Sequence, residues 1–203
     1  MNRVGILRVL ADILEEKEKM DRFNSPGFNI NTWFNECSLH LPKGQDEFTL
    51  KAGVSPTLCG TSLCVAGFAA IEAGWSVMIR RANQSYNGKS WDVYETRWSS
   101  PDGSTHREPN WWTVGADYLG LAHYQAFIIF YATFDRGAQS IQILERLAVG
   151  DMPTVEEWKE YARIAGKLDS YMLYEECSVP WEHPDCDVPW EHPGTSVTTM
   201  SDV

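Results

Sequence analysis

The sequence predicts a mostly helical α+β fold, with a small helical core, a Trp-rich β-hairpin insertion and an extended C-terminal tail. Apolar residues recur at helical spacing in several segments. The stretch at about 75–113 changes to short runs rich in Trp, Tyr and Val that are separated by turn residues. Residues 177–203 begin with one nine-residue unit written twice. We therefore expect a single helical domain over 1–176, which includes the insertion, and a tail over 177–203.

Two main helices and a short one are predicted in the N-terminal part of the chain. The first, over residues 4–20, has an apolar face made of Val4, Leu7, Leu10, Ala11 and Leu14. A short helix can begin at Asn31, and residues 42–44 form a turn. The second main helix covers residues 59–74, with Thr61 able to cap its start. Because only Glu72 is charged there, we expect this helix to be central and buried on most sides.

The later elements are predicted in the same way. Strand-forming residues over 76–79 and 91–98, followed by a polar turn at 99–103, indicate the hairpin. Helical spacing then predicts helices over 114–119, 122–134 and 138–149. Thr154 and Glu157 form a capping box that opens a last helix, whose apolar face runs from Trp158 to Met172.

The tail repeats a unit that contains Cys, Trp, Glu and His. Residues 177–185 and 186–194 are identical at seven of nine positions, and we expect residues 195–203 to be disordered. As a Pro-stiffened peptide ligand, the tail would present Trp181, Glu182, His183, Trp190, Glu191 and His192. A zinc site is the alternative, with the ligands Cys177, His183, Cys186 and His192. The duplication produces this spacing by itself, so both interpretations stay open.

The insertion gathers aromatic side chains and arginines. A nucleobase or sugar could stack on its rings while an arginine meets a phosphate. The candidate residues are Trp91, Tyr94, Arg97, Trp98, Trp111 and Trp112, with Arg80, Arg81 and Arg107 as further phosphate contacts. We expect Trp98 to be the most exposed of the rings, because the polar turn follows it. The alternative is that these aromatics pack on the helical core.

The cysteines are expected to be reduced thiols, because their number is odd, at five, and no secretory signal precedes them. Within one helix, Cys59 and Cys64 would lie about 8.6 Å apart, too far for a disulfide, which favours a packing role. Zinc ligation by Cys37, His40, Cys59 and Cys64 is a second possibility. Neither His106 nor His123 has a recognisable nucleophile partner, and phosphate-binding Gly loops are absent from the sequence. The sequence therefore gives no catalytic residue, and we expect no cofactor, with a zinc ion in the tail or at these cysteines as the one alternative.

The composition limits the partners. A formal net charge of −11 disfavours duplex nucleic acid and anionic membranes, because both are bound by clustered Lys and Arg. The sequence has neither a secretory leader nor an apolar stretch of membrane-spanning length, so we expect a cytoplasmic protein.

Residues 59–70 read Cys-Gly-Thr-Ser-Leu-Cys-Val-Ala-Gly-Phe-Ala-Ala, and Ala116-Asp-Tyr-Leu-Gly-Leu121 and the run from Gln125 to Phe130 follow. Together with Asn31-Thr-Trp-Phe34, this pattern resembles a group of small uncharacterised proteins of actinobacterial phages and some bacteria. The resemblance covers about half of the chain. It implies a mostly helical phage or mobile-element accessory protein.

Three functional hypotheses follow from the sequence. The first is a non-enzymatic protein that binds a host protein, with counter-defence as one setting. The second is a sponge or hydrolase of a nucleotide-type signal, which would use the Trp-rich insertion. The third is a zinc-stabilised interaction module.

Overall fold

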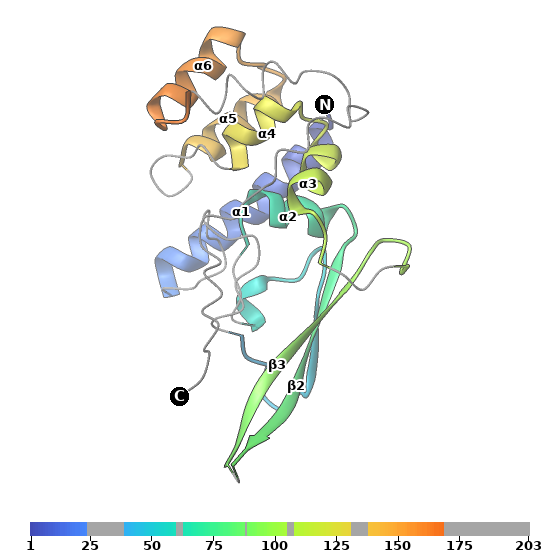
Figure 1. Ribbon diagram of the computed structural model, residues 1–203. Helices are drawn as coiled ribbons and strands as arrows, with labels where there is room; N and C mark the ends of the chain where they lie inside the picture. The colour runs from blue at the N-terminus through green and yellow to red at the C-terminus, as the bar shows by residue number, and fades with distance from the viewer. Residues whose placement is uncertain (24–38, 60–62, 88, 105–107, 131–137, 169–203) are drawn as a thin grey trace, which may run out of the picture.

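A computed structural model describes residues 1–23, 39–59, 63–87, 89–104, 108–130 and 138–168 (Figure 1). The helices gather at one end of the molecule, and a long hairpin extends away from them (Figure 1). The fold is α+β, as predicted. In chain order, the elements are α1 (Arg3–Phe23), β1 (Glu47–Leu50), the 3₁₀ helix η1 (Pro56–Cys59), α2 (Val65–Glu72), β2 (Ser76–Tyr86), β3 (Lys89–Ser99), α3 (Trp111–Leu119), α4 (His123–Phe130), α5 (Ala138–Val149) and α6 (Val155–Ile164). The predicted helix at Asn31 and the tail over 177–203 lie outside the described residues.

Helix α1 confirms the predicted N-terminal helix but buries a different face. Its buried apolar residues are Ile6, Val9, Leu10 and Ile13, and the helix packs on α2, α3 and α5. The predicted face is wrong, because Val4, Leu7 and Leu14 are 61%, 52% and 42% exposed. Both sets of residues have helical spacing and lie on roughly opposite sides of the helix, so periodicity alone does not tell which of them turns inward.

The sheet has three antiparallel strands in the order β1-β2-β3. Strands β2 and β3 pair from Ser76 opposite Ser99 to Tyr86 opposite Lys89, so the hairpin is much longer than the short strands predicted. Asn87, at φ 51°, occupies the left-handed conformation that a tight hairpin turn requires. Strand β1, which the sequence did not predict, adds Leu50 opposite Val77.

Helix α2 is buried as predicted but begins later. Its N-cap is Cys64, whose side chain makes no capping hydrogen bond, so the predicted start at Cys59 is wrong, and the predicted cap Thr61 lies outside the described residues. All residues from Val65 to Ile71 are buried. A Cβ on Gly115 of α3 would lie 3.2 Å from the Cα of Ala66, so the missing side chain allows the two helices to approach closely.

The C-terminal helices largely follow the predicted ranges. Asn110 caps α3 by accepting a hydrogen bond from the backbone N–H of Thr113, so this helix begins earlier than predicted. The capping box of Thr154 and Glu157 at the start of α6 is confirmed. Helix α6 ends at Ile164 and is followed by Gly166 at φ +67°, so the predicted continuous face does not reach Leu168.

The start of α1 is tied to two later helices. The Arg3 guanidinium donates two hydrogen bonds to the carbonyl of Ala148, at 2.9 and 3.1 Å. The backbone N–H of Asn2 donates to the carbonyl of Leu119 at 2.8 Å. These bonds fix the start of α1 to the last residues of α3 and α5, which lie more than a hundred residues later in the sequence.

Candidate binding surface on the sheet

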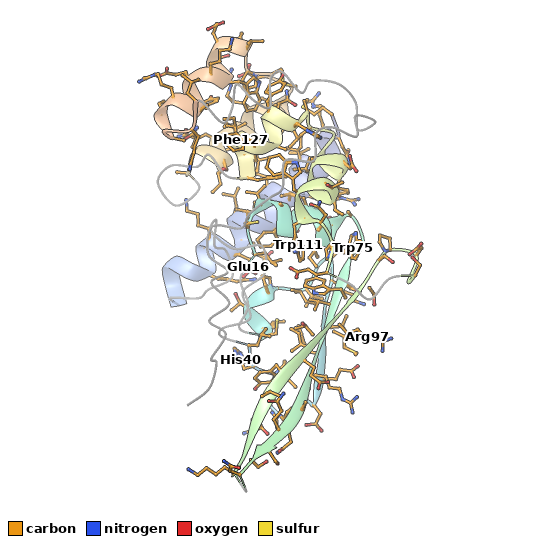
Figure 2. All side chains as sticks on the ribbon, viewed as in Figure 1. Glu16, His40, Trp75, Arg97, Trp111 and Phe127 are labelled. Carbon is orange, nitrogen blue, oxygen red and sulfur yellow. The ribbon has the colours of Figure 1, made fainter. Side chains whose placement is uncertain are left out.

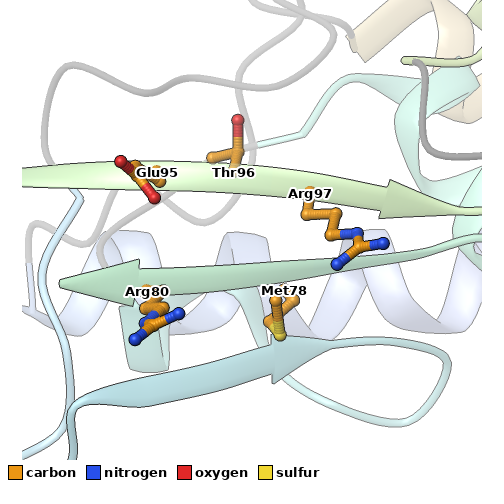
Figure 3. Close-up of a pocket in the computed structure, with 5 residues that line it drawn as sticks. All are labelled: Met78, Arg80, Glu95, Thr96 and Arg97. Atoms are coloured by element: carbon orange, nitrogen blue, oxygen red, sulfur yellow. The ribbon is translucent and has the colours of Figure 1, made fainter. Parts of the chain in front are cut away.

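The two faces of the hairpin differ in chemistry. On the central strand β2, Val77 and Ile79 turn toward the core and are fully buried. Arg80, the next residue along the strand, is exposed on the other face. On the outer side the sheet is hollowed into a shallow concavity of about 510 Å³ (Figure 3). It is lined by Met78, Arg80, Glu95, Thr96 and Arg97. The strand register sets Arg80 opposite Glu95 and Met78 opposite Arg97.

The hairpin carries a net positive charge within an acidic chain. Residues 76–99, which we call the arm, contain four basic and two acidic residues and carry a net charge of +2. The whole chain carries −11, so the remainder carries −13. The basic residues of the arm are Arg80, Arg81, Lys89 and Arg97, and its acidic residues are Asp92 and Glu95. The arm therefore offers cations that an acidic partner would approach in preference to the rest of the surface.

Trp98 is not the exposed ring that the sequence predicts. It is only 5% exposed and meets Trp111 edge to face, with ring centroids 4.7 Å apart and planes at 84°. Trp98 stands opposite Val77 in the register, so strand alternation directs it to the core side, whatever the polarity of the turn that follows.

The other predicted insertion residues are not brought together into one site. Trp111 is buried, and its indole N–H donates to a carboxylate oxygen of Glu108 at 2.7 Å. Trp112 packs against Phe127 and Phe130, and Tyr94 is also partly buried against the core. Arg97 neighbours Trp98 in the strand and is exposed, on the outer side (Figure 3). The side chain of Trp91 and all of Arg107 lie outside the described part of the chain. The described aromatics thus follow the packing interpretation.

A buried carboxylate, which the sequence reading missed, joins α1 to the segment before α2. Glu16 is 2% exposed and accepts hydrogen bonds from the hydroxyls of Ser55 at 2.5 Å and Thr57 at 2.6 Å (Figure 2). Lys19 adds a charged contact to it at 2.7 Å. The available signal was the position of Glu16, three residues after Ile13 on the buried face.

A pair of carboxylates, Asp12 and Glu72, lies between α1 and α2. Burial raises the pKa of Asp12 to about 6, with further contributions from the nearby charges of Glu72 and Glu15 and from a side-chain hydrogen bond with Glu72. This pair can hold a proton between the two helices. Among the described residues, no group of three or more His, Cys, Asp or Glu side chains is arranged to hold a metal ion.

The two described cysteines are buried, free thiols. Burial raises the pKa of Cys64 to about 12, so its nucleophilic thiolate form is suppressed at neutral pH. The thiol of Cys59 donates to the carbonyl of Pro56 at 3.3 Å. These contacts support the predicted packing role. Cys37 and the tail ligands Cys177, His183, Cys186 and His192 lie outside the described residues, as do the peptide-ligand residues Trp181, Glu182, Trp190, Glu191 and His192.

No family model matches the chain, and no curated protein or solved structure resembles it significantly. Within the ranges that the structure describes, no helix combines the length and the apolar character needed to cross a bilayer.

Proposed function

We propose that this chain is a non-enzymatic phage or mobile-element accessory protein that binds a host protein in the host cytoplasm, with counter-defence as one setting. The observation that carries this proposal is the projecting arm, which is basic in an otherwise strongly acidic chain. The origin from a phage or mobile element comes from the sequence resemblance described above.

The chemistry of the arm suits a protein partner with an acidic surface. Arg80 and Arg97 can pair with carboxylates, and Met78, opposite Arg97 in the register, offers an adaptable apolar contact. Arginine and methionine are both enriched at protein interfaces. The acidic remainder of the chain would repel the same partner, so the charge distribution favours an approach in which the arm leads.

The duplicated tail supplies a second contact in this proposal. Its two copies of Val-Pro-Trp-Glu-His-Pro would act as linked anchors, which raises the effective concentration of one copy once the other has bound. If the tail instead binds zinc, the metal would order the same anchors, and the chain would act as a zinc-stabilised interaction module.

A nucleotide-type signal is the second candidate ligand, and a specific observation favours it. Two arginines line the concavity on the sheet, where a phosphate could bind (Figure 3). Glu95 in the same concavity opposes an anion, and Trp98 and Trp111 are buried and cannot provide the stacking platform. These points make the protein partner the better supported hypothesis.

A pull-down from an actinobacterial host lysate tests the proposal. The baits are the full chain, a form truncated after Glu176, Arg80→Glu and the control Arg163→Glu. Arg163 is a 63% exposed arginine on α6, so the control makes the same charge change away from the arm. We expect the full chain and the control to retain one host protein. Arg80→Glu and the truncation should each reduce the amount of this protein that is retained. Retention by all four baits, or by none, would contradict the proposal.

A titration with a panel of nucleotides, followed by calorimetry, distinguishes the alternative. Saturable binding that is lost in Arg97→Ala would favour the nucleotide ligand. Trp98→Ala is unsuitable for this purpose, because the buried ring supports the fold.

A further inference from the structure

Helix α1 carries an apolar row on the side that faces away from the core. The row, which we call the outer stripe, consists of Val4, Leu7, Ala11 and Leu14, all of which are exposed. The opposite side of the same helix is buried against α2, α3 and α5. A helix that is apolar on two sides is typical of one that is covered on both, and a contiguous exposed apolar row marks an interaction site.

The spacing of the outer stripe indicates what covers it. Its residues follow one another at intervals of three, four and three, which is the a and d pattern of a coiled coil. This pattern fits a second helix with the same repeat, packed at a shallow angle. A flat or irregular partner would not need this regular spacing.

The charges beside the stripe favour a second copy of α1 in the antiparallel direction. Arg8 and Glu15 are both exposed and lie seven residues apart, so they flank the stripe on the same side. In an antiparallel pair, the basic half of one helix meets the acidic half of the other, and Arg8 approaches Glu15 of the second copy. In a parallel pair, Arg3 would face Arg8 of the other copy, and the two positive charges would repel each other. Arg3 is held in place by its two hydrogen bonds to Ala148, so it could not turn away. The opposed helix dipoles also favour the antiparallel arrangement.

We propose that two copies of this chain associate through their outer stripes, with Val4 of each copy opposite Leu14 of the other and Leu7 opposite Ala11. The two interfaces are identical, so the association closes as a twofold dimer. The stripe belongs to a different element from the arm, and this inference does not depend on the proposed function.

Sedimentation velocity of the full chain over a wide concentration range tests the association. We expect a concentration-dependent monomer–dimer equilibrium that Leu7→Glu weakens by roughly tenfold or more, because a charge replaces a buried leucine at the seam. Leu58→Glu is the matched control, since Leu58 is 53% exposed and Leu7 is 52% exposed. The control should associate like the wild type. A wild-type chain that stays monomeric throughout, or a Leu7→Glu dimer as tight as the control, would overturn the proposal. Equal thermal midpoints of the two variants would show that Leu7→Glu leaves the fold intact.

The orientation is tested by disulfide cross-linking of mixed copies. A chain with Val4→Cys and a chain with Leu14→Cys should cross-link efficiently only when mixed, because the antiparallel register places these positions opposite each other. The wild type shows the background from the native cysteines. Cross-linking of Val4→Cys with itself would indicate a parallel pair, and a mixture that does not exceed the background would also overturn the proposed register.

Discussion

Trp98 of β3 meets Trp111 of α3 edge to face, with ring centroids 4.7 Å apart. This contact joins the base of the arm to the helical core, and both indoles are almost fully buried. The indole N–H of Trp111 is satisfied by Glu108, so the pair is anchored by a hydrogen bond as well as by packing. The arm can project from the core because its base is held in this way.

Replacing Trp98 with Ala should destabilise the fold by about 3–5 kcal/mol, because it removes a large buried ring and leaves a cavity next to Trp111. Urea unfolding followed by circular dichroism measures the change. Arg97→Ala, at the neighbouring exposed position, should change the unfolding free energy by less than about 0.5 kcal/mol. Equal effects of the two substitutions would contradict the burial of Trp98.

Glu16→Ala should lower the free energy of unfolding by about 1–3 kcal/mol, because the hydroxyls of Ser55 and Thr57 lose their acceptor. Glu15→Ala, one residue earlier at a 66% exposed side chain, should change it by less than about 0.5 kcal/mol. Chemical denaturation of both variants gives the comparison. If Glu15→Ala had the larger effect, the assignment of Glu16 as the buried acceptor would be wrong.

Stability should fall as the pH rises through about 6. The pKa of Asp12 is raised from 3.8 to about 6 in the folded protein, so the folded state binds this proton more tightly than the unfolded chain. Its stabilising contribution is therefore complete below pH 3.8 and is lost as the pH rises past about 6. Above that pH, the ionised carboxylate lies beside Glu72, Glu15 and Glu16.

Thermal midpoints of the wild type and Asp12→Asn across this pH range test the assignment. We expect the variant to gain stability relative to the wild type with rising pH, because the amide cannot ionise. Glu72→Gln should move the wild-type transition to lower pH, since it removes one of the charges that raise the pKa of Asp12. A constant difference between Asp12→Asn and the wild type at every pH would argue against a shared proton at this site.

Thr154→Ala should destabilise the protein by about 1 kcal/mol, because it removes the hydroxyl that accepts from the backbone N–H of Glu157 at the start of α6. Thr154→Ser keeps this acceptor and should retain most of the stability. Thermal unfolding of both variants measures the difference. Equal losses from Ala and Ser would assign the effect to packing of the methyl group instead of the cap.

The sequence is most informative where a local signal fixes the structure. The capping box at Thr154 and the apolar run of α2 act through neighbouring residues, and both are confirmed. Which apolar side of α1 turns inward depends on its contact with α5. The burial of Trp98 depends on its position opposite Val77 in the strand register. These are tertiary relationships, and a propensity or the polarity of a nearby turn does not encode them.

The candidate surface shows the same division. The excess of basic residues in the arm can be counted from the sequence, but the strand register decides that Arg97 faces outward while Trp98 is buried. Glu16 was missed because a charged residue on a helix is normally assigned to the solvent side. Its burial depends on Ser55 and Thr57, which lie about forty residues later in the chain.

The hydrogen bonds from Arg3 to Ala148 also constrain how the chain folds during synthesis. Helix α1 leaves the ribosome well before α5, on which it packs, and α5 is made almost last among the described elements. The side of α1 that packs on α5 therefore stays uncovered by that helix while the intervening residues are translated, a period in which chaperones can bind it. The contact between α1 and α5 also slows folding, because the chain loses the entropy of the long intervening loop before the stabilising contacts form.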